Sequence, residues 1–266
     1  MSIDIKNQIF EKIVEIYHLD KHNFNKKPFI ISHQNVKDIA GKYFSHIDNN
    51  SKEIRILGSQ TERGLRPKYF INNNLFLLPK SNTSWYFLKG EGYVDIPDLK
   101  TPILKASYPV TSKLELFKFG DSEMKFLDAC HTDKILEDFS QEKDLVLCKR
   151  GRFRSGGFKM MVNKISVSID RGVQMEVDAG YENKNSIFLI EAKSNTKVDN
   201  EIIRQIYFPY REITSQIGSS KKKVRNIFIS QDKKNSCLNF YEYIFKDPMD
   251  YESIELIKSS RYEYNL

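Results

Sequence analysis

Two carboxylates and one lysine lie at the ends of two adjacent strand-like segments in the second half of the chain. Asp178 ends the alternating segment 173–178, and Glu191 and Lys193 end the segment 187–193, which begins with four apolar residues. If the two segments pair as a hairpin, Asp178 lies next to Glu191, and Lys193 shares a face with Glu191. Like-charged carboxylates repel unless a cation lies between them, and oxygen ligands favour a hard ion such as Mg²⁺. The spacing therefore predicts a Mg²⁺ site whose remaining positions take water and phosphate oxygens.

A hairpin must position these residues, and its two strands differ in pattern. Residues 173–178 alternate between apolar and polar side chains, which is typical of a strand with one buried face. Residues 187–190 are apolar without a break, which is typical of a strand buried on both faces. Gly180 and the polar run 182–186 are predicted to form the turn. A helix is predicted to follow over about 199–215.

Asp178 together with Glu191-Ala192-Lys193 resembles the D-x(n)-E-x-K signature of the PD-(D/E)XK nuclease superfamily. The surrounding sequence is similar to that of a group of type II restriction endonucleases, and this resemblance covers about residues 145–210. The matching residues are Gly151-Arg152, Ser155-Gly156, Phe158, the run Glu176-Val177-Asp178-Ala179-Gly180-Tyr181-Glu182, and Glu191-Ala192-Lys193. Val177 stands where the proline that names the motif is expected, a departure that many members share.

The resemblance implies a role for each residue of the motif. Asp178, Glu191 and the carbonyl of Ala192 would bind Mg²⁺, which polarises the scissile phosphate and holds the attacking water. Lys193 would orient or deprotonate that water and stabilise the charge that builds up on the phosphate. Gln205, on the predicted helix, would lie near the site as a further polar catalytic group.

Two further acidic residues are candidates for the same site. Glu176 shares a strand face with Asp178, which makes it a candidate neighbour or additional ligand. Glu123, in a helix predicted over 122–131, is a candidate extra acidic group. The alternative interpretation is that all these charges form an ordinary salt-bridge cluster on the surface.

The composition is that of a soluble globular protein and limits the function classes. The chain has 266 residues, of which 40% are hydrophobic and 29% charged, enough for one large domain or two small ones. No apolar run approaches the ~20 residues that span a membrane, and the N-terminal segment does not resemble a signal peptide, so a cytoplasmic protein is expected. The three cysteines are widely spaced, which predicts neither a disulfide framework nor a zinc site.

The first half has the pattern of a small winged-helix-like module. Helices are predicted over 3–18 and 32–45, and short strands over 53–57, 75–78, 85–88 and 92–96. The segment 97–109 carries three prolines and marks the expected domain boundary. We therefore predict an N-terminal winged-helix-like recognition or accessory domain over residues 1–105 and a PD-(D/E)XK catalytic domain over residues 106–266.

The predicted fold class is α/β, as a mixed α+β restriction-endonuclease-like core whose central mixed sheet is flanked by helices. The formal net charge of +7 favours a polyanionic partner. Phosphate contacts would supply affinity for DNA, and contacts to base edges would supply specificity. The candidates for these contacts are Arg63, Arg66, Arg152, Arg154, Lys221 and Lys222.

Together these features predict a type II restriction endonuclease that uses Mg²⁺ to hydrolyse double-stranded DNA at a short specific sequence. Cutting both strands takes two active sites, which favours a homodimer, and a cognate DNA methyltransferase is expected in the same restriction–modification system. The alternatives are a structure-specific repair or recombination nuclease and a non-catalytic winged-helix DNA-binding regulator. An interaction protein that binds no nucleic acid is a further alternative.

Overall fold

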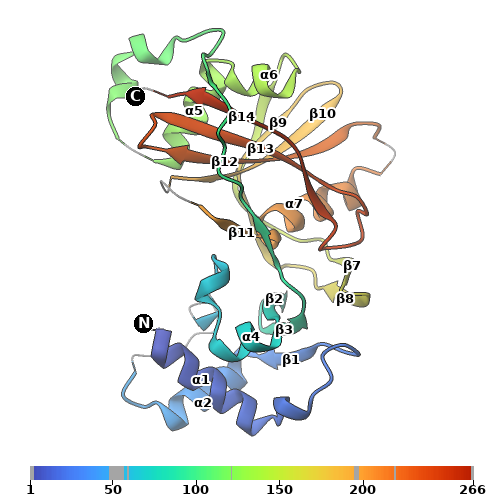
Figure 1. The fold of residues 1–266 in the computed structure, drawn as a ribbon. Coiled ribbons are helices and arrows are strands. Elements are labelled where there is room, and N and C mark those ends of the chain that lie inside the picture. The colour runs from blue at the N-terminus through green and yellow to red at the C-terminus, as the bar shows by residue number, and fades with distance from the viewer. Residues whose placement is uncertain are drawn as a thin grey trace.

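The computed structural model describes residues 3–47, 57–58, 60–120, 122–194, 198–218 and 220–264. A small N-terminal module lies below a larger α+β domain, whose central mixed sheet is flanked by helices (Figure 1). The predicted fold class is confirmed at this level. Among the described residues, no helix is both long and apolar enough to cross a membrane.

The N-terminal module combines helices with a small antiparallel sheet. Its main elements are α1 (Ile3–Ile16), β1 (Phe29–Ser32), α2 (His33–Tyr43), α4 (Lys68–Asn73), β2 (Leu75–Ser81) and β3 (Ser84–Lys89), and the strand order is β1-β3-β2. The N-cap predicted at Ser32 is confirmed, because its hydroxyl accepts a hydrogen bond from the N–H of Asn35 at 3.0 Å. The strand predicted over 53–57 falls outside the described residues except for Leu57.

The sheet of this module packs against two separate cores. One face covers α1, α2 and α4, where Phe70 meets Phe87 edge to face with ring centroids 4.8 Å apart. The other face, which carries Phe76 and Tyr86, belongs to a core shared with the larger domain. There the Tyr86 hydroxyl donates to the carbonyl of Ser168 at 3.0 Å. The two parts of the chain are therefore joined by packing as well as by the chain itself.

The central sheet of the larger domain has seven strands in the order β5-β14-β13-β12-β10-β9-β6. These strands are β5 (Ile103–Leu104), β6 (Val146–Arg154), β9 (Gln174–Glu182), β10 (Ser186–Lys193), β12 (Lys223–Asp232), β13 (Cys237–Phe245) and β14 (Ile254–Glu263). β10 runs parallel to β12 and antiparallel to β9, so the sheet is mixed. Two short pairs lie outside it, namely β7 (Phe158–Val162) with β8 (Ile165–Ile169), and β4 (Tyr93–Asp95) with β11 (Asn200–Ile202).

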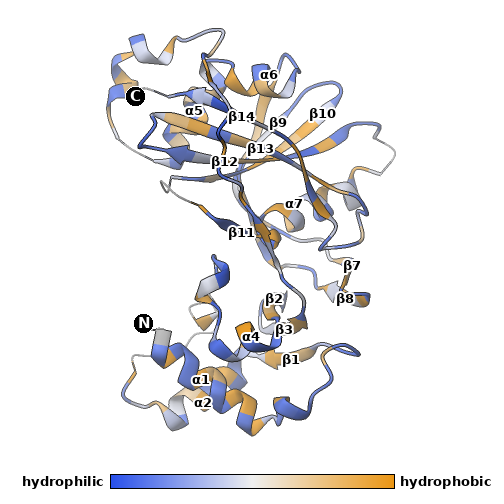
Figure 2. Ribbon diagram, in the orientation of Figure 1, coloured by the Kyte–Doolittle hydropathy of each residue, from blue (hydrophilic) through white to orange (hydrophobic). Residues whose placement is uncertain are grey.

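Helices cover both faces of the central sheet (Figure 1). α7 (Ile203–Gln216) packs on one face, and α5 (Glu123–Thr132) and α6 (Ile135–Ser140) pack on the other. This explains the unbroken apolar run, because Leu189 packs in the core under α7 while Phe188 and Ile190 pack in the core under α5 and α6. Hydrophobic residues are accordingly concentrated on β10 and β13 (Figure 2). Short 3-10 helices complete the chain: η1 (Leu19–Lys21), η3 (Arg63–Leu65), η4 (Thr111–Lys113) and η5 (Glu115–Lys118).

The turn of the central hairpin is shorter than predicted. β9 continues through Gly180, and the turn contains only residues 183–185. The Asn183 side-chain oxygen accepts a hydrogen bond from the N–H of Ser186 at 2.8 Å and so closes this turn. Gly180 instead allows β6 to approach closely, because a Cβ atom at this position would lie 3.3 Å from the Cβ of Lys149. The prediction that Gly180 belongs to the turn is therefore wrong.

A second hairpin and the start of α7 complete the surroundings of the central hairpin. Residues 158–169 form this second hairpin, and Asn163 and Lys164 at its turn both adopt left-handed backbone conformations with φ of 45° and 66°. The helix expected from about residue 199 begins at Ile203. The residues before it form β11, which pairs with β4, a strand about a hundred residues earlier in the chain.

Gly92 lies where the N-terminal module meets the larger domain, and we expect it to tolerate no side chain. Its φ of 73° is left-handed, and an added Cβ would lie 2.5 Å from the Phe76 ring. We expect Gly92→Ala to lower the free energy of unfolding by about 1–3 kcal/mol, as measured by urea denaturation. Gly64→Ala is the matched control, because nothing lies within 4 Å of its added Cβ. Equal losses in the two variants would contradict this packing.

Candidate active site

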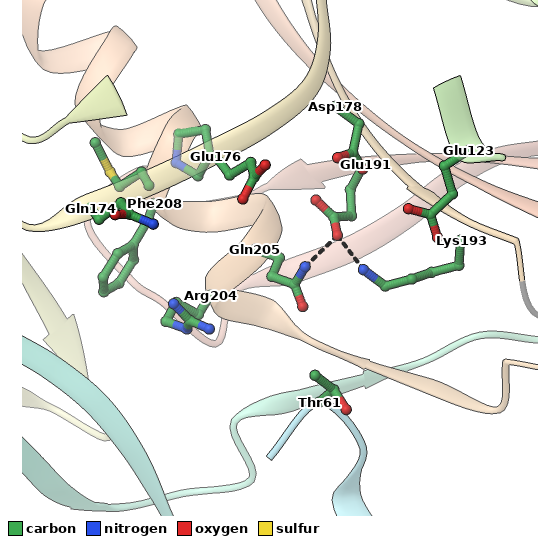
Figure 3. A pocket seen from close by; sticks show the side chains of 12 residues that line it. Thr61, Glu123, Gln174, Glu176, Asp178, Glu191, Lys193, Arg204, Gln205 and Phe208 are labelled. Atoms are coloured by element: carbon green, nitrogen blue, oxygen red, sulfur yellow. Dashed lines mark hydrogen bonds and ion pairs between the residues drawn. The ribbon is translucent and has the colours of Figure 1, made fainter. Parts of the chain in front are cut away.

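A polar cavity of about 430 Å³ opens where β9 and β10 meet the start of α7 (Figure 3). Acidic, basic and amide side chains share its wall, and the residues that matter most are Glu123, Asp178, Glu191, Lys193, Arg204 and Gln205. Thr61, from the N-terminal part of the chain, lines the same cavity. The sequence-predicted residues Asp178, Glu191, Lys193 and Gln205 are thus brought together in one place.

The pairing of β9 with β10 brings the two carboxylates together. The described register ends where Ile190 faces Ala179, one residue before Glu191 on one strand and one residue after Asp178 on the other. Beyond that point the Asp178 side chain accepts a hydrogen bond from the N–H of Ala192 at 2.7 Å. The side chain of Asp178 therefore continues the contact between the strands and is held next to the backbone of Ala192.

Glu191 is the centre of the hydrogen-bonded cluster. Only 7% of this residue is exposed, and one of its carboxylate oxygens accepts hydrogen bonds from both the Lys193 ammonium and the Gln205 side-chain amide (Figure 3). Lys193 comes from the same strand two residues on, and Gln205 comes from the first turn of α7. The side-chain oxygen of Gln205 is buried and finds no hydrogen-bond partner among the described residues. The cluster therefore retains an unused acceptor.

Burial shifts the protonation of the two carboxylates in the same direction. Removal from water raises the pKa of Glu191 to about 8, although the nearby Lys193 acts to lower it. Burial also raises the pKa of Asp178, against the effect of the Ala192 N–H. For Lys193, burial acts to lower the pKa, but the carboxylates of Glu191 and Glu201 outweigh it and raise the pKa. Excess negative charge is thus costly in this cavity, and a bound cation would relieve that cost.

The donors fit a small oxygen-ligated metal site. Among the described residues, no three acidic, histidine or cysteine side chains lie close enough together to hold a metal ion by themselves. Proteins usually bind Mg²⁺ through one or two carboxylates, and water and substrate phosphates fill the other positions. Asp178 and Glu191 line the cavity and correspond to this smaller donor set, and the carbonyl of Ala192 stays a predicted ligand. That the described residues form no such group of three is therefore compatible with the predicted ion.

Sequence reasoning missed Glu201, which lies next to the lysine of the cluster. Glu201 is 2% exposed, and its carboxylate lies 3.8 Å from the Lys193 ammonium. Its other oxygen accepts a hydrogen bond from the N–H of Ile202 at 3.1 Å, and burial raises its pKa to about 7. Glu201 belongs to β11, a strand that depends on its pairing with β4. The local sequence gave no signal for it, because these three residues resemble the start of a helix.

The two candidate acidic residues both lie at the cavity but have different partners. Glu123, in the first turn of α5, accepts a hydrogen bond from the N–H of Ser194 at 3.0 Å, so it anchors the end of β10. Glu176 lines the cavity and lies 3.3 Å from the guanidinium of Arg152. The side chains of Glu176 and Arg152 are 51% and 69% exposed, so this ion pair lies in contact with solvent, and of the two only Glu176 lines the cavity.

The arginines predicted to contact DNA divide into two groups. Arg152 and Arg154 are exposed on β6, the edge strand of the sheet, and Arg154 donates to the carbonyl of Gly172 at 2.9 Å. Arg66 is buried and donates to the carbonyl of Leu75 at 3.1 Å. We therefore do not carry Arg66 into a DNA-binding surface.

Arg63 is largely committed to contacts within the protein. Its guanidinium lies 2.8 Å from the carboxylate of Asp95 and also pairs with Glu91. Its backbone N–H donates to the side chain of Asn200 at 2.7 Å. Arg63 thus ties the loop before α4 to the β4–β11 pair, and DNA contact would require breaking these bonds.

Lys221 and Lys222 lie at the opposite end of the sheet from the cavity. In the parallel pairing of β10 with β12, Ser186 faces Lys223, whereas Lys193 faces Ser230. The length of β10 therefore separates the two places, which is roughly 23 Å at the usual rise per strand residue. Lys222 also forms an ion pair with Glu182. The structure does not bring these two lysines together with the acidic cluster.

The raised pKa of Glu191 predicts how the stability of the metal-free protein depends on pH. The folded state holds this proton more tightly than the unfolded chain, so the resulting stability is present below about pH 4.5 and is lost as pH rises through about 8. With chelator present, the free energy of unfolding of the wild type should fall between pH 5 and pH 8.5. We expect this fall to be about 1–3 kcal/mol larger than the fall in Glu191→Gln over the same pH range.

Chemical denaturation at the two pH values measures this difference. Glu11→Gln, which changes an exposed carboxyl on α1, is the control and should behave like the wild type. The same pH dependence in all three proteins would show that Glu191 does not hold a strongly perturbed proton.

Comparison with known proteins gives a family for most of the chain. Residues 88–263 match the family model described as Domain of unknown function (DUF6997), and residues 7–87 match the one described as Domain of unknown function (DUF6996). Neither a curated protein nor a solved structure matches the chain. The two family matches meet within β3, whereas the domain boundary after residue 105 stays a prediction. Because the first match spans more than half of the 266 residues, the chain belongs to the DUF6997 family.

Proposed function

We propose that this protein is a Mg²⁺-dependent endonuclease that hydrolyses phosphodiester bonds in double-stranded DNA at a short specific sequence, as type II restriction endonucleases do. The observation that carries the proposal is the meeting of Asp178, Glu191, Lys193 and Gln205 at one cavity of about 430 Å³. These are the residues that the D-x(n)-E-x-K resemblance and the following helix predict to act together. A surface salt-bridge cluster would not bury Glu191 to 7% exposure.

The chain's own residues can perform specific parts of this reaction. Bound Mg²⁺ supplies charge stabilisation at the phosphate and makes water more acidic. Asp178 and Glu191 would hold this ion as carboxylates, and the Gln205 amide fixes the orientation of the Glu191 carboxyl group. The Lys193 ammonium is positioned to donate a hydrogen bond to an oxygen on which negative charge develops.

The proton balance of the hydrolysis limits the role of Lys193. Water forms a new bond to phosphorus, one ester oxygen leaves, and a proton passes from the water to the leaving oxygen or to solvent. The carboxylates of Glu191 and Glu201 raise the pKa of Lys193, so this lysine is charged at neutral pH. Hydrogen-bond donation to the phosphate is therefore the role that its surroundings favour, and removing a proton from water is the less favoured one.

The fold around the cavity supports DNA as the substrate. Helices α1, α2 and α4 with a sheet in the order β1-β3-β2 agree with a winged-helix-like module, and the central β9–β10 hairpin with α7 agrees with a restriction-endonuclease-like core. Thr61 brings the N-terminal part of the chain to the cavity wall. Arg152 and Arg154 are exposed on the edge strand next to β9, and the net charge of +7 favours a polyanion. A homodimer and a cognate methyltransferase remain expectations that accompany this proposal.

Cleavage of plasmid DNA tests the proposed activity. We expect discrete fragments in Mg²⁺, no cleavage in chelator, and a loss of at least about 10³-fold in rate for Asp178→Ala and Lys193→Ala, because each removes a group that acts on the phosphate. Lys184→Ala is the control, since this exposed lysine lies in the turn between β9 and β10, at the far end of β10 from the cavity. Fragment patterns on gels of sequenced plasmids are the measurement.

Other outcomes separate the competing functions. A smear, or a preference for branched substrates, would favour a structure-specific nuclease with the same active site. Salt-sensitive DNA binding without cleavage in Mg²⁺ or Mn²⁺ would contradict the nuclease proposal and favour a DNA-binding regulator. Absence of both binding and cleavage would favour an interaction protein.

A further inference from the structure

Arg204 is a cation on the cavity wall to which the motif assigns no role. It is the second residue of α7, between Ile203 and the catalytic candidate Gln205, and its side chain is only partly exposed. It lines the cavity that Asp178, Glu191 and Lys193 also line (Figure 3). Gln205 and Lys193 donate hydrogen bonds to Glu191, whereas Arg204 makes no interaction with the other residues drawn. Its charge is therefore available to something that enters the cavity.

The hydrogen bonding of Arg204 differs from that of the comparable arginines. Within the described ranges, each of the other arginines that is at least partly buried donates to a protein acceptor: Arg63, Arg66, Arg150, Arg211, Arg225 and Arg261. For Arg204 the same part of the chain offers no side-chain hydrogen bond and no ion pair. A guanidinium has five N–H donors, and withdrawing them from water without an acceptor is costly.

The carboxylate closest in the chain does not take up this guanidinium. Glu201, three residues earlier, directs one oxygen to the N–H of Ile202 and the other to the Lys193 ammonium at 3.8 Å. Arg204 affects Glu201 only through its positive charge, which partly opposes the rise that burial causes in the pKa of that carboxyl. A purely structural role as counter-ion would place the two groups in contact. The N–H groups of the planar Arg204 guanidinium can instead donate to an oxyanion, and their arrangement matches the geometry of phosphate oxygens.

We propose that Arg204 binds the non-bridging oxygens of a phosphate group that enters the cavity, across from the cluster around Glu191. The identification of that phosphate with the DNA backbone rests on the proposed function. The binding of an oxyanion by Arg204 rests only on the cavity, the partial burial and the unused donors. Arg204 would thus hold the substrate phosphate while Lys193 and the carboxylates act on it.

Inorganic phosphate provides a test that does not depend on nuclease activity. In the Ca²⁺-loaded protein we expect the Arg204 Nε–H resonance, identified by its absence from the spectrum of Arg204→Lys, to shift on titration with phosphate. The Arg211 resonance, from the same helix, should not shift, because Arg211 already donates to the carbonyl of Lys159. Chloride at equal ionic strength should move neither. No shift of Arg204 at saturating phosphate would overturn the proposal.

Variants at the two helix positions extend the test to DNA. We expect Arg204→Gln to lower the single-turnover cleavage rate about 100-fold. The slope of log affinity for duplex DNA against log salt concentration should become shallower by the amount that corresponds to about one phosphate contact. Arg211→Gln should show neither change. Arg204→Lys keeps the charge but loses the fork, and should recover only part of the rate. Thermal melting checks that each variant folds. Equal rates and salt slopes for Arg204→Gln and Arg211→Gln would overturn the role toward DNA. If the Arg204 resonance shifts with phosphate but the protein never cuts DNA, the oxyanion site is supported and the proposed nuclease activity is contradicted.

Discussion

The structure depends on the burial of the Glu191 carboxylate at the end of a core strand. Taking a charge out of water costs several kcal/mol unless it is compensated, and two groups compensate it here. Lys193 donates from the same strand and Gln205 donates from α7, whereas the carboxylate of Asp178 on β9 repels that of Glu191. Burial is the main cause that raises the pKa of Glu191 to about 8, and the nearby carboxylates of Asp178 and Glu201 add to it. Such an arrangement is poor for stability alone and suits a site that receives a cation.

The rest of the fold keeps this cluster in place. Residues of β10 pack alternately into the core under α7 and the core under α5 and α6, so the strand that carries Glu191 is held from both faces. Glu123 fixes the strand end through Ser194. On the other side, the β4–β11 pair brings Glu201 to Lys193, and Arg63 ties the preceding loop of the N-terminal module to that pair. The N-terminal module is thus physically connected to the lysine of the cluster.

The sequence allowed prediction of those parts that depend on local pattern. Alternation in 173–178 and the apolar run 187–190 were enough to place Asp178 beside Glu191, and helical periodicity placed Gln205. Glu201 and Arg204 were out of reach, because β11 exists only through pairing with β4, and the free guanidinium is recognisable only once the acceptors around it are known. The distance of the basic run at Lys221 from the acidic cluster could not be predicted for a related reason. In a parallel pair, residues before β12 lie at the start of β10, away from its charged end. Arg66 is likewise basic in sequence but buried in the fold.

The most direct measurement of the central claim is anomalous diffraction from crystals of the protein soaked in Mn²⁺. We expect a peak bound by the carboxylates of Asp178 and Glu191, and we expect this peak to be absent from Glu191→Gln crystals under the same conditions. A wild-type map without a peak at this place, with the Lys193 ammonium still against Glu191, would contradict the assignment of this cavity as a metal-dependent active site.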